Sequence, residues 1–280
     1  MRSGHEPMNR GRERLALAAT VLGSSMAFID GSVVNIALPA MQRELASGSA
    51  GLAAMQWVVN AYLLALGSLV LIGGALGDRY GRRRIFLAGI ALFTIASAAC
   101  GLAPNAAALI GARALQGVGA ALLVPSSLAI IGAVFSGEAR GKAIGTWAAW
   151  ASITAAAGPV LGGWLVDQWS WRAIFFLNLP LGAITAWLAL AAVPDSRDSE
   201  APPQLDWLGA GLVAAGLGAL TWGLTLAPER GWGAASVWGA LAAGAVLLAA
   251  FVVSQAKGRA PMMPLSLFRS RDFTGANLVT

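Results

Sequence analysis

Long apolar segments alternate with short polar stretches along almost the whole chain. Most of these segments have about the twenty residues that an α-helix needs to cross a hydrocarbon core of about 30 Å. Eight complete segments occur, at 15–38, 53–76, 85–101, 106–132, 143–166, 173–193, 208–226 and 234–253. A ninth begins near Phe273. The pattern predicts an all-α membrane protein with eight transmembrane helices and the start of a ninth.

The basic residues predict how these helices are oriented. If the N-terminus lies inside, fifteen of the nineteen Lys and Arg residues fall in inside segments, three fall in outside loops, and Arg113 falls within a span. Loops rich in Lys and Arg remain on the cytoplasmic side of a membrane. We therefore expect a multi-pass protein of the plasma or inner membrane with a cytoplasmic N-terminus, in contact with the lipid bilayer.

The polar stretches also divide the chain into parts. Residues 194–207 are rich in Pro, Asp and Ser, which is typical of a linker, and they follow the sixth apolar segment. The expected parts are a cytoplasmic tail (1–14), a six-helix bundle (15–193), a cytoplasmic linker (194–207), two additional helices (208–256), a basic cytoplasmic connector (257–272) and the start of the ninth helix (273–280).

Composition excludes several classes of function. Hydrophobic residues make up 57% of the chain and charged residues 11%, whereas a soluble domain has about 25% charged residues. The single cysteine, Cys100, lies in an apolar segment, and the single histidine, His5, lies in the N-terminal tail. No P-loop, Ser-His-Asp set, paired-carboxylate motif or nucleic-acid-binding motif occurs. We therefore expect no enzyme, no metal site, no cofactor and no nucleic-acid partner.

Two formal charges lie inside the eight predicted spans, Asp30 in the first and Arg113 in the fourth. Each lies roughly 10–12 Å from the outer end of its span, so the two share a level and should meet. Ionisable groups at this depth are costly and mark functional sites. Arg113 favours the charged form of Asp30, whereas desolvation favours the neutral form. This opposition predicts a proton-coupling pair; the alternative is a static ion pair that fixes helix register.

A glycine-rich and arginine-rich loop separates the second and third spans. The arginines alone predict no more than a cytoplasmic anchor. The full pattern Gly-x-Leu-x-Asp-Arg-x-Gly-Arg-Arg-Arg resembles the signature loop of the major facilitator superfamily of transporters. The resemblance implies a gate on the cytoplasmic side, formed by Gly74, Asp78, Arg79, Gly81, Arg82, Arg83 and Arg84.

Further segments resemble the fourteen-helix drug:proton antiporters of this superfamily. They are the first-span segment 28–39, the fourth-span segment 109–121 with Arg113, and the segment 171–180. The fifth span resembles the antiporter motif, although Thr154 replaces its middle glycine; the residues that match are Gly145, Gly158, Pro159, Gly162 and Gly163. The alternative for this span is an ordinary proline kink with small-residue packing.

An internal repeat supports the same architecture. A shift of 89 residues places Gly73 and Gly74 on Gly162 and Gly163, and Asp78 on Asp167. Because the shift spans three helices, the two copies lie on opposite sides of the membrane. We expect a six-helix half of a facilitator, built from two inverted three-helix repeats.

Aromatic and amide side chains near the middle of the second, fourth and fifth spans are candidates to line a substrate cavity. They are Trp57, Asn60, Tyr62, Gln116, Trp147 and Trp150. The alternative is helix packing or an interfacial belt of aromatic residues.

The resemblance implies a secondary active transporter that exports a small, lipophilic compound or drug in exchange for protons by alternating access. Such a transporter uses the proton gradient as its energy source and needs a C-terminal half that these 280 residues lack. We expect either that the protein continues past Thr280 or that the chain is a truncated product. A facilitator for another metabolite and a membrane scaffold without transport remain as alternatives.

Overall fold

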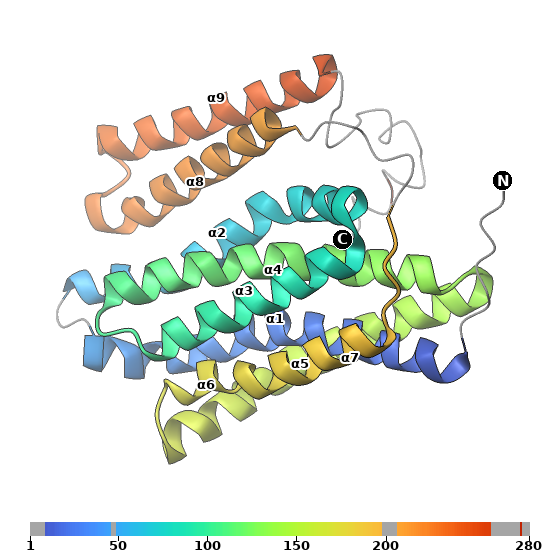
Figure 1. The fold of residues 1–280 in the computed structure, drawn as a ribbon. Helices are drawn as coiled ribbons and strands as arrows, with labels where there is room; N and C mark the ends of the chain where they lie inside the picture. Colours follow the sequence, from blue (N-terminus) through green and yellow to red (C-terminus); the bar gives the residue numbers. More distant parts are fainter. Residues whose placement is uncertain (1–8, 46–48, 198–205, 259–274, 276–280) are drawn as a thin grey trace. The chain divides into compact units, whose positions relative to one another are not determined.

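The computed structural model describes residues 9–45, 49–197, 206–258 and 275, and within them every regular element is an α-helix (Figure 1). The helices are α1 (Arg10–Leu45), α2 (Ser49–Tyr80), α3 (Arg82–Gly101), α4 (Ala106–Val134), α5 (Gly137–Gln168), α6 (Ala173–Phe176), α7 (Asn178–Ala192), α8 (Trp207–Arg230) and α9 (Ala235–Lys257). Eight stretches of helix are long and apolar enough to cross a membrane, and α6 with α7 forms the sixth. The eight predicted spans are thus confirmed; the ninth, near Phe273, lies outside the described residues.

The helices extend beyond the apolar segments that predicted them. For example, α1 continues past residue 38 to Leu45, and α5 begins at Gly137 rather than near residue 143. Hydropathy marks only the part of a helix that lies in hydrocarbon, whereas the hydrogen-bonded helix continues until a cap ends it. At the start of α4, the side chain of Asn105 provides such a cap by accepting a hydrogen bond from the backbone N–H of Ala108 (2.9 Å).

The sixth span is interrupted, which the sequence analysis did not anticipate. It divides at Leu177 into α6 and α7. Pro180 lies in the first turn of α7 and has no N–H to donate to the Phe176 carbonyl one turn before it. The interruption places the Asn178 side chain and the Phe175 carbonyl within hydrogen-bonding distance of the Ser97 hydroxyl in α3, at 3.0 and 2.8 Å.

The chain forms two compact units, 1–201 and 202–280. In the second unit, α8 and α9 pack as a hairpin. A side chain at Gly216 or Gly244 would meet Leu248 or Leu220 of the opposite helix, so small residues set the close approach of the pair. Asp206 caps α8 by accepting a hydrogen bond from the Gly209 N–H (2.7 Å).

In the first unit, α4 packs against α2 and α3, whereas α1 packs against α5 and α7. Two inverted three-helix repeats predict this packing. The first helix of each repeat, α1 or α4, packs against the second and third helices of the other repeat. Glycines bring the backbones together: a side chain at Gly117 would meet the Tyr62 backbone in α2, and one at Gly119 would meet Phe93 in α3. The bundle therefore places the middles of α1 and α4 at its centre.

Candidate functional site

The predicted pairing of Asp30 with Arg113 is present at the centre of the first unit. The guanidinium Nη1 of Arg113 donates to Oδ2 of Asp30. The two residues are 3% and 1% exposed, and they are the buried charged residues among those that the structure describes. A charge pair this deep is stable only when the remaining donors and acceptors are also satisfied.

Gln116 completes a closed ring of hydrogen bonds with this pair. Its Nε2 donates to Oδ1 of Asp30 (2.8 Å), and its Oε1 accepts from Nη1 of Arg113 (2.8 Å). The Nε of Arg113 donates to the Val58 carbonyl of α2 (3.1 Å). Gln116 lies one helical turn after Arg113 on α4. The same helix therefore positions both the charged Arg113 side chain and the neutral Gln116 side chain that bridges it to Asp30.

Aromatic rings cover the cation. The guanidinium carbon of Arg113 lies 4.2 Å from the centre of the Tyr62 ring and 5.9 Å from that of Phe175. Cation–π attraction strengthens when both partners are desolvated, as here. The Tyr62 hydroxyl donates to the Ala27 carbonyl of α1 (3.0 Å), so Tyr62 also joins α2 to the helix of Asp30.

Asn178 and Ser97 also belong to this site, although the sequence pattern marks neither of them as a site residue. The Nδ2 of Asn178 donates to the Ser97 hydroxyl (3.0 Å) and, over a longer distance, to Oδ1 of Asp30 (3.4 Å). The Oδ1 of Asn178 is buried and has no hydrogen-bond partner among the described residues. An amide within an apolar span, two residues before Pro180, is the signal that could have identified it.

We name the residues around this pair the central polar cluster; they are Asp30, Tyr62, Ser97, Arg113, Gln116 and Asn178. The cluster joins α1, α2, α3, α4 and the break between α6 and α7. Removal of one partner from a buried ion pair costs about 3–5 kcal/mol. A proton added to Asp30 would remove one charge of the pair, so the protonation state of one carboxyl group bears on the packing of five helical segments.

The predicted gate residues lie where α2 ends and α3 begins, and Asp78 binds a guanidinium. Nε and Nη2 of Arg82 donate to Oδ1 of Asp78, at 2.9 and 2.8 Å. Gly81 joins the two helices with a φ of 111°, a conformation that L side chains rarely adopt. A Cβ at this position would also lie 2.7 Å from Oδ1 of Asp195. Gly74 lies one turn before Asp78, and a Cβ added at Gly74 would be in ordinary contact with Pro125.

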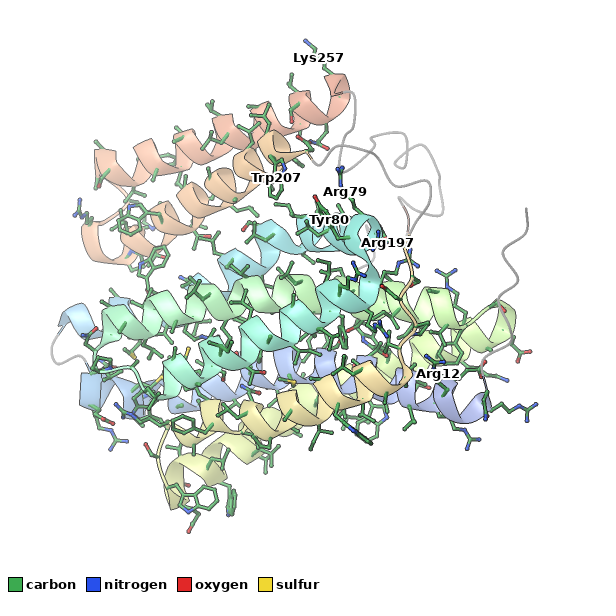
Figure 2. All side chains as sticks on the ribbon, in the orientation of Figure 1. Arg12, Arg79, Tyr80, Arg197, Trp207 and Lys257 are labelled. Atoms are coloured by element: carbon green, nitrogen blue, oxygen red, sulfur yellow. The ribbon has the colours of Figure 1, made fainter. Side chains whose placement is uncertain are left out.

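The other arginines of the loop have different partners. Arg83 donates to the Val193 carbonyl (3.3 Å), Arg84 pairs with Asp195 (3.3 Å), and Arg79 lies 5.4 Å from the centre of the Tyr80 ring. Arg12, Arg79 and Arg197 lie toward the same end of the bundle, which we call the basic end (Figure 2). The loop thus binds the segment after α7 in addition to its own helices.

The opposite end of the bundle carries a second polar clamp. Glu44 near the end of α1 accepts from the Trp171 indole (2.6 Å) and from Arg172 (2.5 Å). Arg172 also donates to the Ala103 carbonyl between α3 and α4 (3.1 Å). Arg172 is the residue that the 89-residue shift places on Arg83, so both copies of the repeat carry an arginine that binds another segment.

Only part of the predicted fifth-span motif forms a close contact within the described chain. A side chain at Gly158 would meet Ser32, and one at Gly162 would meet Val33, so these two glycines hold α5 against α1. A Cβ added at Gly163 would lie 4.0 Å from the Ile36 side chain, and one added at Gly145 would have no atom within 4 Å. The helix continues through Pro159.

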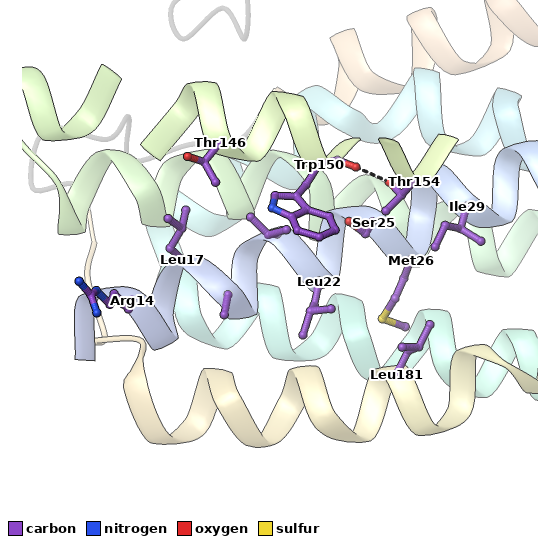
Figure 3. A pocket seen from close by; sticks show the side chains of 12 residues that line it. Arg14, Leu17, Leu22, Ser25, Met26, Ile29, Thr146, Trp150, Thr154 and Leu181 are labelled. Carbon is purple, nitrogen blue, oxygen red and sulfur yellow. Dashed lines mark hydrogen bonds between the residues drawn. The ribbon is translucent and has the colours of Figure 1, made fainter. Parts of the chain in front are cut away.

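The six candidate cavity residues do not gather in one place. Tyr62 and Gln116 belong to the central polar cluster. The Trp147 indole donates to the Ser24 hydroxyl (2.9 Å), and its ring meets Phe28 edge-on at 5.9 Å. Trp150 is 49% exposed and lines an apolar pocket between α1, α5 and α7 (Figure 3). Trp57 and Asn60 are half-buried in α2.

The sequence of this helical bundle matches a known protein family. The model of the Major Facilitator Superfamily matches residues 20–268. The chain belongs to the Major Facilitator Superfamily. The resemblance inferred from the loop at the basic end and from the fourth and fifth spans is therefore confirmed, and the chain is a multi-pass membrane protein.

Curated members of the superfamily match along almost the whole chain. The multidrug resistance protein Stp of Mycobacterium tuberculosis (strain CDC 1551 / Oshkosh) is 43% identical over 95% of this chain and 49% of its own length. The tetracenomycin C resistance and export protein of Streptomyces glaucescens is 40% identical over 95% of this chain and 49% of its own length. The chain thus spans about half the length of the curated relatives it matches.

Solved structures of two POT transporters share the fold. A crystal structure of the peptide transporter POT in complex with sulfate matches 87% of this chain and 53% of that chain, with a TM-score of 0.63 and 18% sequence identity. An in meso crystal structure of the POT family transporter PepTSo matches 94% of this chain and 57% of that chain, with a TM-score of 0.61 and 14% identity. At this identity the likeness supports the half-transporter fold alone.

Proposed function

We propose that the chain forms one half of a secondary active transporter that exports small lipophilic compounds or drugs in exchange for protons. The observation that carries the proposal is the buried pair of Asp30 and Arg113 at the centre of a facilitator fold. The names of the relatives, which describe multidrug resistance and export of an antibiotic, support the class of substrate. The energy source is the proton gradient, without a cofactor.

The proton step is assigned to Asp30. When Asp30 is ionised, Arg113 and Gln116 bind both of its oxygens. When it is protonated, the attraction to Arg113 is lost and the new O–H needs an acceptor. The unpartnered Oδ1 of Asn178 belongs to the amide that already contacts Asp30. Rotation of this amide would present that acceptor, which makes the neutral state of Asp30 accessible inside the bundle.

The remaining motifs are assigned to the conformational cycle. The Lys and Arg distribution supports a cytoplasmic N-terminus in the plasma membrane, so the basic end faces the cytoplasm. There, the Asp78–Arg82 pair and the contacts of Arg83 and Arg84 with the segment after α7 would hold the inner gate closed. At Gly158 and Gly162, the close contact of α5 with α1 would transmit rearrangement of the central polar cluster to the fifth helix. A second six-helix half completes the cavity around the substrate, and the two halves rock about it.

Transport into everted membrane vesicles with an acidic lumen tests this proposal. The full transporter that contains this chain is first offered a panel of lipophilic antibiotics and dyes, and the best wild-type substrate is then used throughout. An Asp30→Asn variant should insert normally but lose gradient-driven uptake, because it cannot exchange a proton. The matched control is Asp167→Asn, which neutralises an exposed carboxylate near the end of α5. Wild-type uptake by the Asp30→Asn variant would refute the assignment.

A further inference from the structure

An elongated apolar groove lies on the first unit, between α1, α5 and the start of α7, and it is separate from the central polar cluster (Figure 3). It has a volume of about 460 Å³. One stripe of α1 forms its floor, and Trp150 of α5 and Leu181 of α7 form its sides. Arg14 lies at the end of the groove that belongs to the basic end of the bundle.

The interior of the groove offers little to a polar ligand. Thr146 and Thr154 line it, but the hydroxyl of Thr146 donates to the Lys142 carbonyl (2.9 Å) and that of Thr154 donates to the Trp150 carbonyl (2.7 Å). Both hydroxyls are therefore occupied by their own helix. The other side chains of the interior are apolar except for Ser25. A molecule that fills this groove must be apolar along most of its length.

Arg14 gives one end of the groove a positive charge that no residue of the described chain neutralises. Arg12 donates to the Ala192 carbonyl (3.1 Å), and Lys142 pairs with Glu138 (2.8 Å). Arg14, by contrast, is exposed and makes no hydrogen bond or ion pair with the residues that the structure describes. A ligand that fits both features carries an anionic group at one end of a long apolar chain.

The length of the groove indicates which molecule of this kind it fits. On α1 its lining extends from Leu17 to Ile29, which corresponds to about 18 Å at 1.5 Å per residue. One leaflet of a bilayer contributes about 15 Å of hydrocarbon, half of the core thickness. Arg14 lies just beyond the Leu17 end, next to the predicted start of the first apolar segment at residue 15.

We propose that this groove binds an anionic phospholipid of the leaflet at the basic end, with an acyl chain along α1 and the phosphate on Arg14. The acyl chain gains little by leaving other lipid chains, because both surroundings are apolar. Selectivity must therefore come from the headgroup. One arginine near an anionic lipid contributes enough to favour it by about fivefold over a zwitterionic lipid of the same chain length.

Photocrosslinking tests the site without any transport assay. The purified protein is reconstituted in phosphatidylcholine nanodiscs that contain a phosphatidylglycerol with a photoreactive acyl chain, and crosslinked peptides are mapped by mass spectrometry. We expect crosslinks on the α1 and α5 residues of the groove, displaced by unlabelled phosphatidylglycerol about fivefold better than by added phosphatidylcholine.

Two variants distinguish groove binding from general attraction to a basic surface. Arg14→Gln should lower the groove crosslinks about fivefold. Arg10→Gln removes the same charge one turn away, from a residue that does not line the groove, and it should leave them unchanged. Equal losses in both variants, equal displacement by the two lipids, or displacement by a lipophilic drug in preference to phosphatidylglycerol would each overturn the proposal. None of these outcomes bears on the role of Asp30.

Discussion

The carboxylate of Asp30 is held by three side chains from two helices, α4 and α7. Its Oδ2 accepts from Arg113, and its Oδ1 accepts from Gln116 and Asn178. All of these donors favour the ionised form, whereas the surrounding low dielectric favours the neutral form. The stability of the buried pair therefore depends on individual hydrogen bonds, and single substitutions of their donors should lower it.

Gln116 offers the clearest such substitution. A Gln116→Met variant keeps the approximate size of the side chain but removes the 2.8 Å donor to Asp30. Because a hydrogen bond to a charged group contributes about 1.5–3 kcal/mol, its loss should lower the free energy of unfolding of the bundle by a similar amount. We expect Gln116→Met to unfold at a lower temperature than the wild type when thermal unfolding is measured in detergent.

The control for this measurement is Cys100→Ala. The Cys100 thiol donates to Gln116 Oε1 (3.5 Å) and does not contact Asp30, so its loss should lower the unfolding temperature less than Gln116→Met does. Equal unfolding temperatures for Gln116→Met and the wild type would mean that Gln116 does not stabilise the buried ion pair.

At the scale of single residues, the sequence predicted the ion pair but not its surroundings. Asp30 and Arg113 are recognisable because a formal charge in an apolar segment is rare, and depth along a helix is simple arithmetic. Asn178 and Tyr62 are different, since an amide or a phenol in a span is common and acquires meaning only from its neighbours. Tyr62 was selected as a cavity residue, whereas it covers the guanidinium of Arg113.

Among the helices, the contact of α2 with α4 depends on glycine at defined positions. A Cβ at Gly117 would meet the Tyr62 carbonyl and would lie 2.8 Å from the Ala65 Cβ. Gly111, on the same helix, has no atom within 4 Å of the same position. The two glycines are therefore a matched pair, one in a close helix contact and one in open space.

Gly117→Ala should destabilise the bundle by about 1–3 kcal/mol, because the backbones of α2 and α4 must separate. Gly111→Ala should keep or slightly raise stability, since alanine favours a helix over glycine by about 0.5–1 kcal/mol. Thermal unfolding of the two variants in detergent compares them directly. Equal unfolding temperatures for the two variants would show that the glycine contact does not determine how closely these helices pack.

The helices themselves were predictable, and their ends were less so. Apolar length gave all eight spans, because hydrocarbon thickness fixes how many residues a span needs. The extension of α1 to Leu45 and the break at Leu177 were not visible in the same pattern. The first lies beyond the apolar segment, where hydropathy carries no signal for a helix. The second involves Pro180, one turn after Phe176, and the hydroxyl of Ser97 on α3. The hydropathy of a single segment contains no information about a contact with another helix.

For the whole molecule, the two ends of the first unit are held by different chemistry. At the basic end, Arg83 and Arg84 bind the segment that follows α7, whereas Glu44 binds Trp171 and Arg172 at the opposite end. The central polar cluster lies between them and contacts both repeats.

Proton release on substrate binding is the measurement that tests this account most directly. The purified full transporter is mixed with its best substrate in weakly buffered detergent solution, and a pH indicator records the protons released. If Asp30 is the coupling group, the wild-type protein releases a proton for each substrate molecule bound, and the Asp30→Asn variant binds substrate but releases none. Release of as many protons by Asp30→Asn as by the wild type would contradict the account.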